Sequence, residues 1–354
     1  MIKNPENSRI PVRHLVAVFF LGITILGTAQ FLERSIAKPD HHMMIKAAAQ
    51  TAGAFQVIGA FCARAGINID RVMDPNLTGL IGEEFTPITT TLGNLSAKQT
   101  SLNPDFAAFI LETLKSHNFQ IGDRIAIQAS ASFPALTIAA IIACETVGLK
   151  PVVSVSLGAS SFGANRAELT YLDLESELIR KGLIRSRSVL VTPGGENDNG
   201  SSYFDGGLEI VQTAARRNGY DLYIPQDLEA SINLKWDLFE AQNGVKFFIN
   251  IGGNQSAIDG GRWPSGLISP NENKGSTGNN GLISKFLAVN IPVLNLLGIR
   301  DLAVRNNIIL SPYPLPEAGV GMVYYQNDIP GVYWLIGLLF MAAGFIYLGF
   351  KREY

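Results

Sequence analysis

The chain has 354 residues, with 28 Lys and Arg residues against 30 Asp and Glu residues and a formal net charge of −2. No run of basic residues interrupts it, so we expect no nucleic-acid partner. The two cysteines, Cys62 and Cys144, lie in apolar helix-like stretches and are predicted to be buried free thiols, although a disulfide between them stays open. Because Cys-x-x-Cys and His-Glu-x-x-His motifs are missing from the sequence, we predict no metal site, and no cofactor is indicated.

Two hydrophobic runs, 15–32 and 331–350, contain no charged residue. Each is long enough to cross a hydrocarbon core of about 30 Å as a single transmembrane helix. Basic residues flank the runs on the sides toward the chain ends, at Lys3, Arg9, Arg13, Lys351 and Arg352. The positive-inside tendency therefore predicts cytoplasmic ends, 1–14 and 351–354, and a main domain on the outer side of the cytoplasmic membrane. A cleaved signal peptide is the alternative interpretation of the first run.

The segment 33–118 is predicted to be a helical and loop-rich cap region. An Ala-rich pattern indicates a helix over 46–65, ended by Gly66. A long polar stretch, 70–101, follows without a clear periodicity. A second helix is predicted from Pro104 to about His117, because Pro suits the first turn and Asn103 suits the cap.

The segment 119–328 alternates between strand-like and helix-like patterns and is predicted to be an extracytoplasmic α/β domain. Such alternation favours right-handed crossovers, and we expect an open, mostly parallel, doubly wound sheet with helices on both faces. The predicted strands are 124–129, 151–156, 188–192, 246–251 and, less clearly patterned, 293–297; the predicted helices are 134–147, 166–181 and 204–218.

Four of these strands end in loops rich in small and polar residues. Ligands of open parallel sheets bind beyond the carboxyl ends of the strands, so the loops predict one shared ligand site. Turn and capping roles are the alternative for each residue taken singly. The stretch from Gly158 to Gly163 has the spacing of a phosphate-binding loop but lacks its Lys and Ser/Thr. The candidate ligand-binding residues are Ser130, Ser132, Ser160, Ser161, Gly194, Gly195, Asp198, Gly252, Gly253 and Asn254.

Candidate catalytic residues are few. Histidine occurs only at positions 14, 41, 42 and 117, none of them in a strand-end loop, so a Ser-His-Asp triad is not favoured. A Ser–Lys arrangement that uses Lys98 with Ser130 or Ser132 stays open, because a serine on a strand-to-helix turn exposes its hydroxyl.

Several blocks resemble the bacterial poly-γ-glutamate system protein, over most of the chain: Thr78-Gly-Leu-Ile-Gly-Glu-Glu84, Ala97-Lys-Gln-Thr-Ser-Leu-Asn-Pro104, Ser130-Ala-Ser-Phe-Pro134, Ser156-Leu-Gly-Ala-Ser-Ser161 and Asn250-Ile-Gly-Gly253. The resemblance implies a bacterial inner-membrane protein that helps to make, export or anchor a γ-linked glutamate polymer. It implies as partners the membrane subunits of the poly-γ-glutamate synthase and export system, and the anionic polymer itself. It supplies no catalytic residues. The block Tyr171-Leu-Asp-Leu-Glu175 is similar to a Trp-x-Asp-Met-Glu-like block of the family, with Tyr and Leu substituted.

Three functional hypotheses follow. The first is an accessory membrane protein of poly-γ-glutamate biosynthesis or export, whose outer domain binds polymer or partner subunits. The second is a γ-glutamyl amidase or transpeptidase with a serine nucleophile, Ser130 or Ser132. The third is a tethered solute-binding protein.

Overall fold

The computed structural model describes residues 34–241, 244–272 and 280–328, with short pieces of the two hydrophobic runs. The chain divides into two compact units, one from 39 to 324 and one that combines 1–38 with 325–354. Within the described ranges, no helix is both long and apolar enough to span a bilayer. Most of the predicted transmembrane segments, 15–32 and 331–350, and both predicted cytoplasmic ends, 1–14 and 351–354, lie outside the described residues.

The smaller unit contains a two-stranded antiparallel ribbon. Strand β1 (Arg34–Ala37) pairs with β12 (Tyr325–Asp328), so that Arg34 lies opposite Asp328 and Ala37 opposite Tyr325. The residues that precede β1 and those that follow β12 therefore leave the ribbon at the same end.

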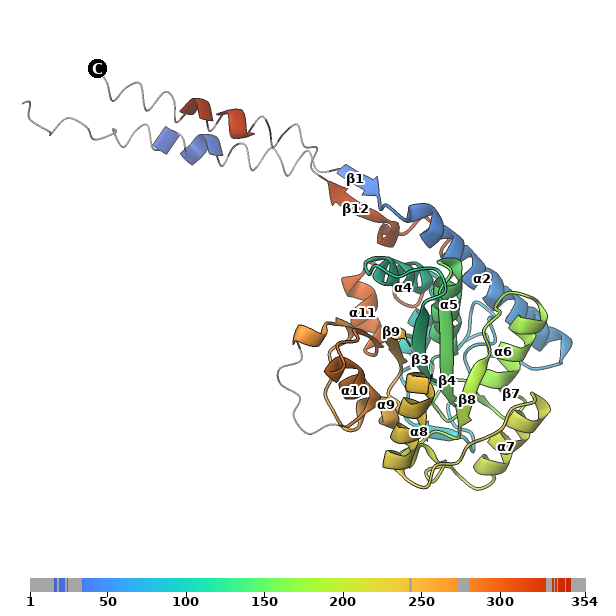
Figure 1. Cartoon of the computed structure of the whole chain (residues 1–354). Helices are drawn as coiled ribbons and strands as arrows, with labels where there is room; N and C mark the ends of the chain where they lie inside the picture. The colour runs from blue at the N-terminus through green and yellow to red at the C-terminus, as the bar shows by residue number, and fades with distance from the viewer. Residues whose placement is uncertain are drawn as a thin grey trace, which may run out of the picture. The chain divides into compact units, whose positions relative to one another are not determined.

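The larger unit is built on a six-stranded sheet in the order β10-β11-β9-β3-β4-β8 (Figure 1). All neighbours are parallel except β10, which is antiparallel to β11 at one edge. This confirms the predicted α/β class with a mostly parallel sheet. The strands are β3 (Arg124–Ser130), β4 (Lys150–Ser156), β8 (Ser188–Thr192), β9 (Val245–Ile251), β10 (Gly266–Ile268) and β11 (Val293–Leu296).

Among the five parallel strands, the strand order reverses direction once. From β3 the chain moves outward to β4 and β8, then returns to the other side of β3 for β9 and β11. The carboxyl ends of β3 and β9 therefore flank a topological switch point, where open parallel sheets leave a crevice.

Helix α5 (Pro134–Thr146) explains how one face of the sheet is covered. Its sequence is apolar on almost every side, which is typical of a helix buried all round. It packs between the sheet and the helices α2 (His41–Arg64) and α4 (Asp105–Lys115), and α6 (Tyr171–Arg180) lies beside α2. The cap region predicted over 33–118 thus shares, from residue 39 onward, one compact unit with the α/β segment.

The opposite face is covered by α8 (Leu228–Ala241) and α10 (Leu282–Ala288). Their aromatic side chains Phe239 and Phe286 pack with Phe248 of β9 in one buried cluster. The Phe248 and Phe286 rings stack with centroids 4.3 Å apart. Helices on both faces make the sheet doubly wound, as expected, although the sequence pattern does not predict α8 or α10.

The polar stretch 70–101 is more regular than its sequence suggests. It contains β2 (Thr89–Thr91), which pairs in parallel with β5 (Ala159–Ser160), and then α3 (Leu95–Ser101). A short hairpin, β6 (Asn165–Arg166) and β7 (Leu169–Thr170), precedes α6, so the predicted helix start at 166 is wrong by five residues. The remaining elements are α7 (Gly207–Arg217), α9 (Gln255–Ile258), α11 (Ile299–Arg305) and the 3-10 helices η2 (Glu196–Asp198), η3 (Pro270–Glu272) and η4 (Met322–Tyr324).

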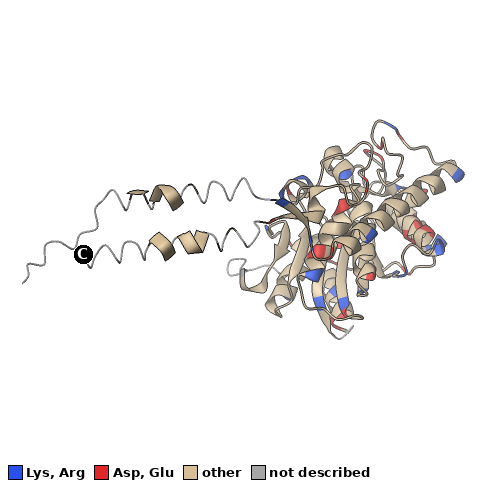
Figure 2. Cartoon of the chain, turned by 90° about the horizontal axis from the view of Figure 1, so that it is seen from above, with Lys and Arg blue, Asp and Glu red and all other residues tan. Residues whose placement is uncertain are grey.

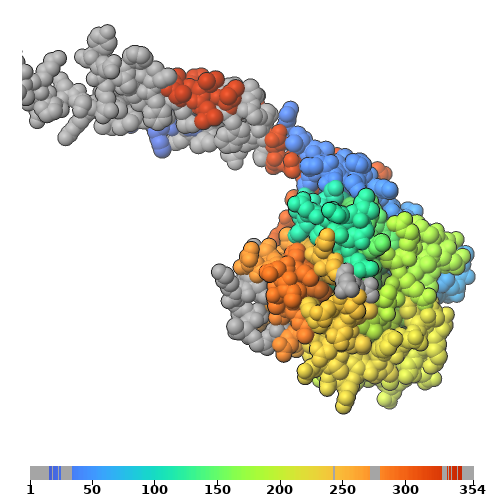
Figure 3. Space-filling model, in the orientation of Figure 1, coloured from blue at the N-terminus to red at the C-terminus, as the bar shows by residue number. Residues whose placement is uncertain are grey.

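Positions of Lys and Arg and positions of Asp and Glu are interspersed along the elements of the larger unit (Figure 2). Helices α2 and α4 and the α6–α7 region form much of the face of the larger unit that Figure 3 shows. Cys62 and Cys144 are both buried and unbonded, which confirms the prediction of free thiols.

Candidate functional site

A cavity of about 650 Å³ lies beyond the carboxyl ends of the strands, at the switch point between β3 and β9. Its walls come from the loops that follow β3, β4, β8, β9 and β11, and from the segment that joins β2 to α3. This cavity therefore lies at the edge of the sheet where the strand-end loops predict a ligand site. Its more polar lining residues are Thr90, Thr91, Asn94, Lys98, Ser130, Ser132, Ser156, Ser160, Glu196, Ser202, Asn254 and Gln255.

The structure brings most of the sequence candidates to this cavity, but not all. The candidates that line it are Lys98, Ser130, Ser132, Ser160, Gly195, Gly253 and Asn254. The candidates that do not line it are Ser161, Gly194, Asp198 and Gly252. Sequence reasoning missed the contributions of 90–94 and of 297–299. A signal existed for the second, because 293–297 has the pattern of a strand and its end had to meet the same edge of the sheet.

Lys98 reaches the cavity because the β2–β5 pairing holds its segment against the loop after β4. Thr91 lies opposite Ser160 in that pairing. At Gly93 a Cβ atom would lie 2.3 Å from the carbonyl oxygen of Ser161, so only glycine allows the two backbones to approach this closely. Asn94 then caps α3 by accepting a hydrogen bond from the Ala97 amide at 2.9 Å, and Lys98 follows in the last turn of this short helix.

The Lys98 ammonium group is almost completely removed from solvent, with 3 % of the residue exposed. Its Nζ lies 2.8 Å from Ser160 Oγ, contacts the carbonyl oxygen of Ser132 and sits 3.9 Å from the centre of the Phe133 ring. Within the described part of the chain, no carboxylate forms an ion pair with it. Burial without a counter-ion lowers the pKa of Lys98 from 10.5 to about 7.

Ser130 and Ser132 support the contact between Lys98 and Ser160 through their own hydrogen bonds. The Ser130 hydroxyl donates to Ser132 Oγ at 2.9 Å, and Ser132 Oγ accepts the Ser160 amide at 2.9 Å. Lys98 contacts the carbonyl oxygen of Ser132, and no bond joins its Nζ to the hydroxyl of either serine. The predicted pairing of Lys98 with the Ser130 or Ser132 hydroxyl is therefore replaced by a pairing with Ser160.

A second buried lysine provides a contrast. Lys235 of α8 is fully buried, and its Nζ lies 2.7 Å from Asp198 Oδ2 and 2.9 Å from Ser256 Oγ. Burial lowers the pKa of Lys235, but the Asp198 carboxylate opposes this shift. Ser156 joins the network, because it donates to Asp198 at 2.7 Å and accepts from Asn254 at 2.6 Å. Asp198 thus joins the loop after β8 to the end of β4 and to α8, and it does not line the cavity.

The Tyr171–Glu175 block also has a structural explanation. Asp173 completes a capping box at the start of α6 and binds Arg217 of α7, with Nε at 2.8 Å from Oδ1. Glu175 is buried and accepts hydrogen bonds from the amide and hydroxyl of Ser188, at 3.0 and 2.7 Å. Both carboxylates therefore join α6 to neighbouring elements, away from the cavity.

The position of His117 fits the expectation against a triad. Its ring packs 5.0 Å from that of Phe247, near the beginning of β9 and thus at the opposite end of the sheet from the cavity.

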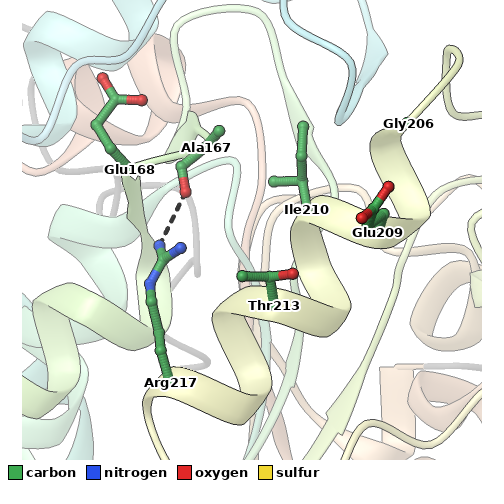
Figure 4. Close-up of a pocket in the computed structure, with 7 residues that line it drawn as sticks. All are labelled: Ala167, Glu168, Gly206, Glu209, Ile210, Thr213 and Arg217. Atoms are coloured by element: carbon green, nitrogen blue, oxygen red, sulfur yellow. Dashed lines mark hydrogen bonds between the residues drawn. The ribbon is translucent and has the colours of Figure 1, made fainter.

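Another cavity, of about 540 Å³, lies between the β6–β7 turn and α7 (Figure 4). Arg217 lines it but is already bound to Asp173 and, at 2.9 Å, to the carbonyl oxygen of Ala167. The other charged side chains there are Glu168 and Glu209, so a ligand would meet mainly carboxylates. It offers neither an unpaired lysine nor a serine, and the strand-end cavity is the stronger candidate.

The arrangement in the strand-end cavity can support nucleophilic acyl chemistry. A lysine with a pKa of about 7 is substantially neutral at neutral pH, and a neutral amine within hydrogen-bond distance of a hydroxyl can accept its proton.

Among the described residues, no group of three His, Cys, Asp or Glu side chains is placed to hold a metal ion. Comparison of the chain with family models, with characterised proteins and with solved structures finds no match.

Proposed function

We propose that this chain is a membrane-anchored component of poly-γ-glutamate production whose outer domain cleaves or transfers γ-glutamyl amide bonds. The observation that carries the proposal is the contact between the buried Nζ of Lys98 and the Ser160 hydroxyl, at 2.8 Å, inside the strand-end cavity. The polymer is suggested by the resemblance of several sequence blocks, and the amide chemistry by the Lys–Ser pair.

In the proposed reaction, neutral Lys98 accepts the proton of the Ser160 hydroxyl while Ser160 Oγ attacks the carbonyl carbon of a γ-glutamyl amide. The C–N bond breaks, and the leaving amine takes the proton from Lys98. A water molecule or a second amine then attacks the ester carbonyl, gives its proton to Lys98 and takes the acyl group as acid or amide. The ester bond to Ser160 Oγ breaks, and Lys98 returns the proton to Ser160 Oγ. Hydrolysis and transfer differ only in this second nucleophile.

The membrane location is supported by two features. The uncharged runs at both ends have the length of single spans. The β1–β12 ribbon places Arg34, the described residue that follows the first run, opposite Asp328, which precedes the second, as two neighbouring spans require. On the outer side of the membrane ATP is scarce, and a Lys–Ser amidase needs none.

The test uses the purified full-length protein in detergent with poly-γ-glutamate, and follows chain length by gel filtration. The wild-type protein should shorten the polymer, while Ser160→Ala and Lys98→Met should each reduce the rate by at least about a hundredfold, the usual scale for losing a nucleophile or its base. Ser116→Ala and Lys181→Met change the same residue types outside the cavity and should retain the wild-type rate.

An unchanged polymer with wild-type protein would contradict catalysis. A measurable affinity for the polymer in that case would favour the accessory binding role instead, which the hydroxyl and amide lining of the cavity also fits.

A further inference from the structure

The strand-end cavity continues into a neighbouring cavity of about 410 Å³. The two share Asn94, Ala97, Gly298 and Ile299 as lining residues, so they are adjacent compartments of the same edge of the fold. The Lys98–Ser160 pair lies in the first compartment, and the second one is lined by two charged residues, Arg300 and Asp301.

Both charged side chains are available to a ligand. Arg300 and Asp301 are exposed and lie next to each other in α11. Within the described chain, neither side chain forms a hydrogen bond or an ion pair, and only the backbone carbonyl of Asp301 is used, by Arg305. The compartment thus has one guanidinium and one carboxylate among its lining residues.

We infer that this compartment binds the ammonium and the α-carboxylate of the amino-terminal residue of a γ-linked glutamate chain, which makes the enzyme act from the chain end. The inference rests on the proposed function. Arg300 binds the α-carboxylate, for which its planar fork is suited, and Asp301 binds the ammonium.

The chemistry of the polymer explains why the Asp301 carboxylate would select the amino-terminal residue. Every residue of the chain carries an α-carboxylate, but the nitrogen of an interior residue is a neutral amide. Only the amino-terminal residue carries an ammonium and a carboxylate on the same carbon. Arg300 alone would accept any residue, whereas the pair with Asp301 selects the end. For cleavage, the scissile γ-carbonyl of that residue has to reach Ser160 in the adjacent compartment.

The test compares a γ-glutamate oligomer that has a free amino end with the same oligomer acetylated at that end. The wild-type protein should release free glutamate from the first and act at least about tenfold more slowly on the second. Arg300→Met and Asp301→Asn should each raise KM for the free oligomer by about tenfold or more, with a smaller change in kcat. Arg262→Met, an exposed arginine outside both compartments, should leave KM unchanged.

A binding experiment separates the two proposals. Calorimetry on Ser160→Ala should show tighter binding of the free oligomer than of the acetylated one. The double variant Ser160→Ala/Asp301→Asn should bind both oligomers equally. Suppose that the wild-type protein is active and its Ser160→Ala variant is inactive. Release of long fragments, or equal rates on both oligomers, would then overturn end recognition alone. Equal activity of Ser160→Ala and wild type would instead overturn the proposed function.

Discussion

At the scale of single residues, the two buried lysines show how surroundings decide the role of one side-chain type. Lys235 has the Asp198 carboxylate at 2.7 Å and two serine hydroxyls, so its charge is compensated. Lys98 has a hydroxyl, a carbonyl oxygen and an aromatic ring, but no carboxylate ion pair within the described chain. The first lysine joins two loops, and the second is the one suited to accept a proton.

The pH dependence of activity should follow Lys98. Because its pKa is lowered to about 7, the neutral base becomes abundant as the pH rises through 7. We expect kcat/KM to increase between pH 6 and 8 and then to level off. The pH profile of the wild-type protein with a short γ-glutamyl amide measures this, and a profile that falls over the same range would contradict Lys98 as the base.

Stability should carry the same signature. Between pH 7 and 10.5 the unfolded chain holds a proton on Lys98 that the folded chain has lost, so the free energy of unfolding should rise with pH across this window. Below pH 7 Lys98 is protonated in both states, so it no longer makes the free energy of unfolding depend on pH. Urea unfolding at several pH values should show a smaller rise in Lys98→Met than in wild type, since Lys235 and other groups keep their own contributions. Equal slopes in the two proteins would exclude the lowered pKa.

Removal of the Asp198 carboxylate should be costly, because it leaves the Lys235 charge buried and unpaired. Asp198→Asn should lower the free energy of unfolding by about 3–5 kcal/mol, as for other broken buried pairs. The double variant Asp198→Asn/Lys235→Met removes both charges and should recover part of this loss. Denaturant unfolding measures both values, and a double variant no more stable than the single one would argue against the ion pair as the cause.

At the scale of elements, the sequence predicts the strands well because their patterns are local. Short apolar runs bounded by glycine and polar residues identify β8 over its observed bounds and β3, β4, β9 and β11 within one residue at each end. The amphipathic period does not identify α8, because Lys235 and Ser231 are buried polar residues on its inner face. Elements whose buried face is polar need tertiary partners to be recognised.

The site was predictable only in part, for a similar reason. Strand-end loops follow from the strand pattern together with the general position of ligands in parallel sheets. The partner of Lys98 does not, because the β2–β5 pairing joins segments almost seventy residues apart, and each strand is only two or three residues long. Ser160 was therefore identified as a site residue, while its contact with Lys98 became visible only in three dimensions.

The close approach at Gly93 gives a test at this scale. Gly93→Ala should displace the segment that carries Lys98, because the new Cβ would lie 2.3 Å from the Ser161 carbonyl oxygen. We expect lower stability and a loss of most amidase activity. Gly53→Ala is the matched control, since a Cβ at this helical position meets nothing within 4 Å and alanine stabilises a helix by about 0.5–1 kcal/mol. Thermal unfolding and polymer cleavage of both variants check the opposite signs.

At the scale of the whole molecule, the β1–β12 ribbon pairs residues 34–37 with residues 325–328, which are far apart in the sequence. If the two uncharged runs cross the membrane, both termini lie on the cytoplasmic side and the unit from 39 to 324 lies outside. Protease added to spheroplasts should then digest that unit and spare a cytosolic marker. Protection in spheroplasts together with digestion in inverted vesicles would place the unit on the cytoplasmic side.

The most direct test of the central claim is to trap the acyl group on Ser160. An activated γ-glutamyl ester is mixed with the protein at pH 8, quenched with acid and examined by intact and peptide mass spectrometry. The account predicts an added γ-glutamyl mass on the peptide that contains Ser160, absent from Ser160→Ala and strongly reduced in Lys98→Met. An adduct on another residue, or no adduct while the polymer is cleaved, would contradict Ser160 as the nucleophile.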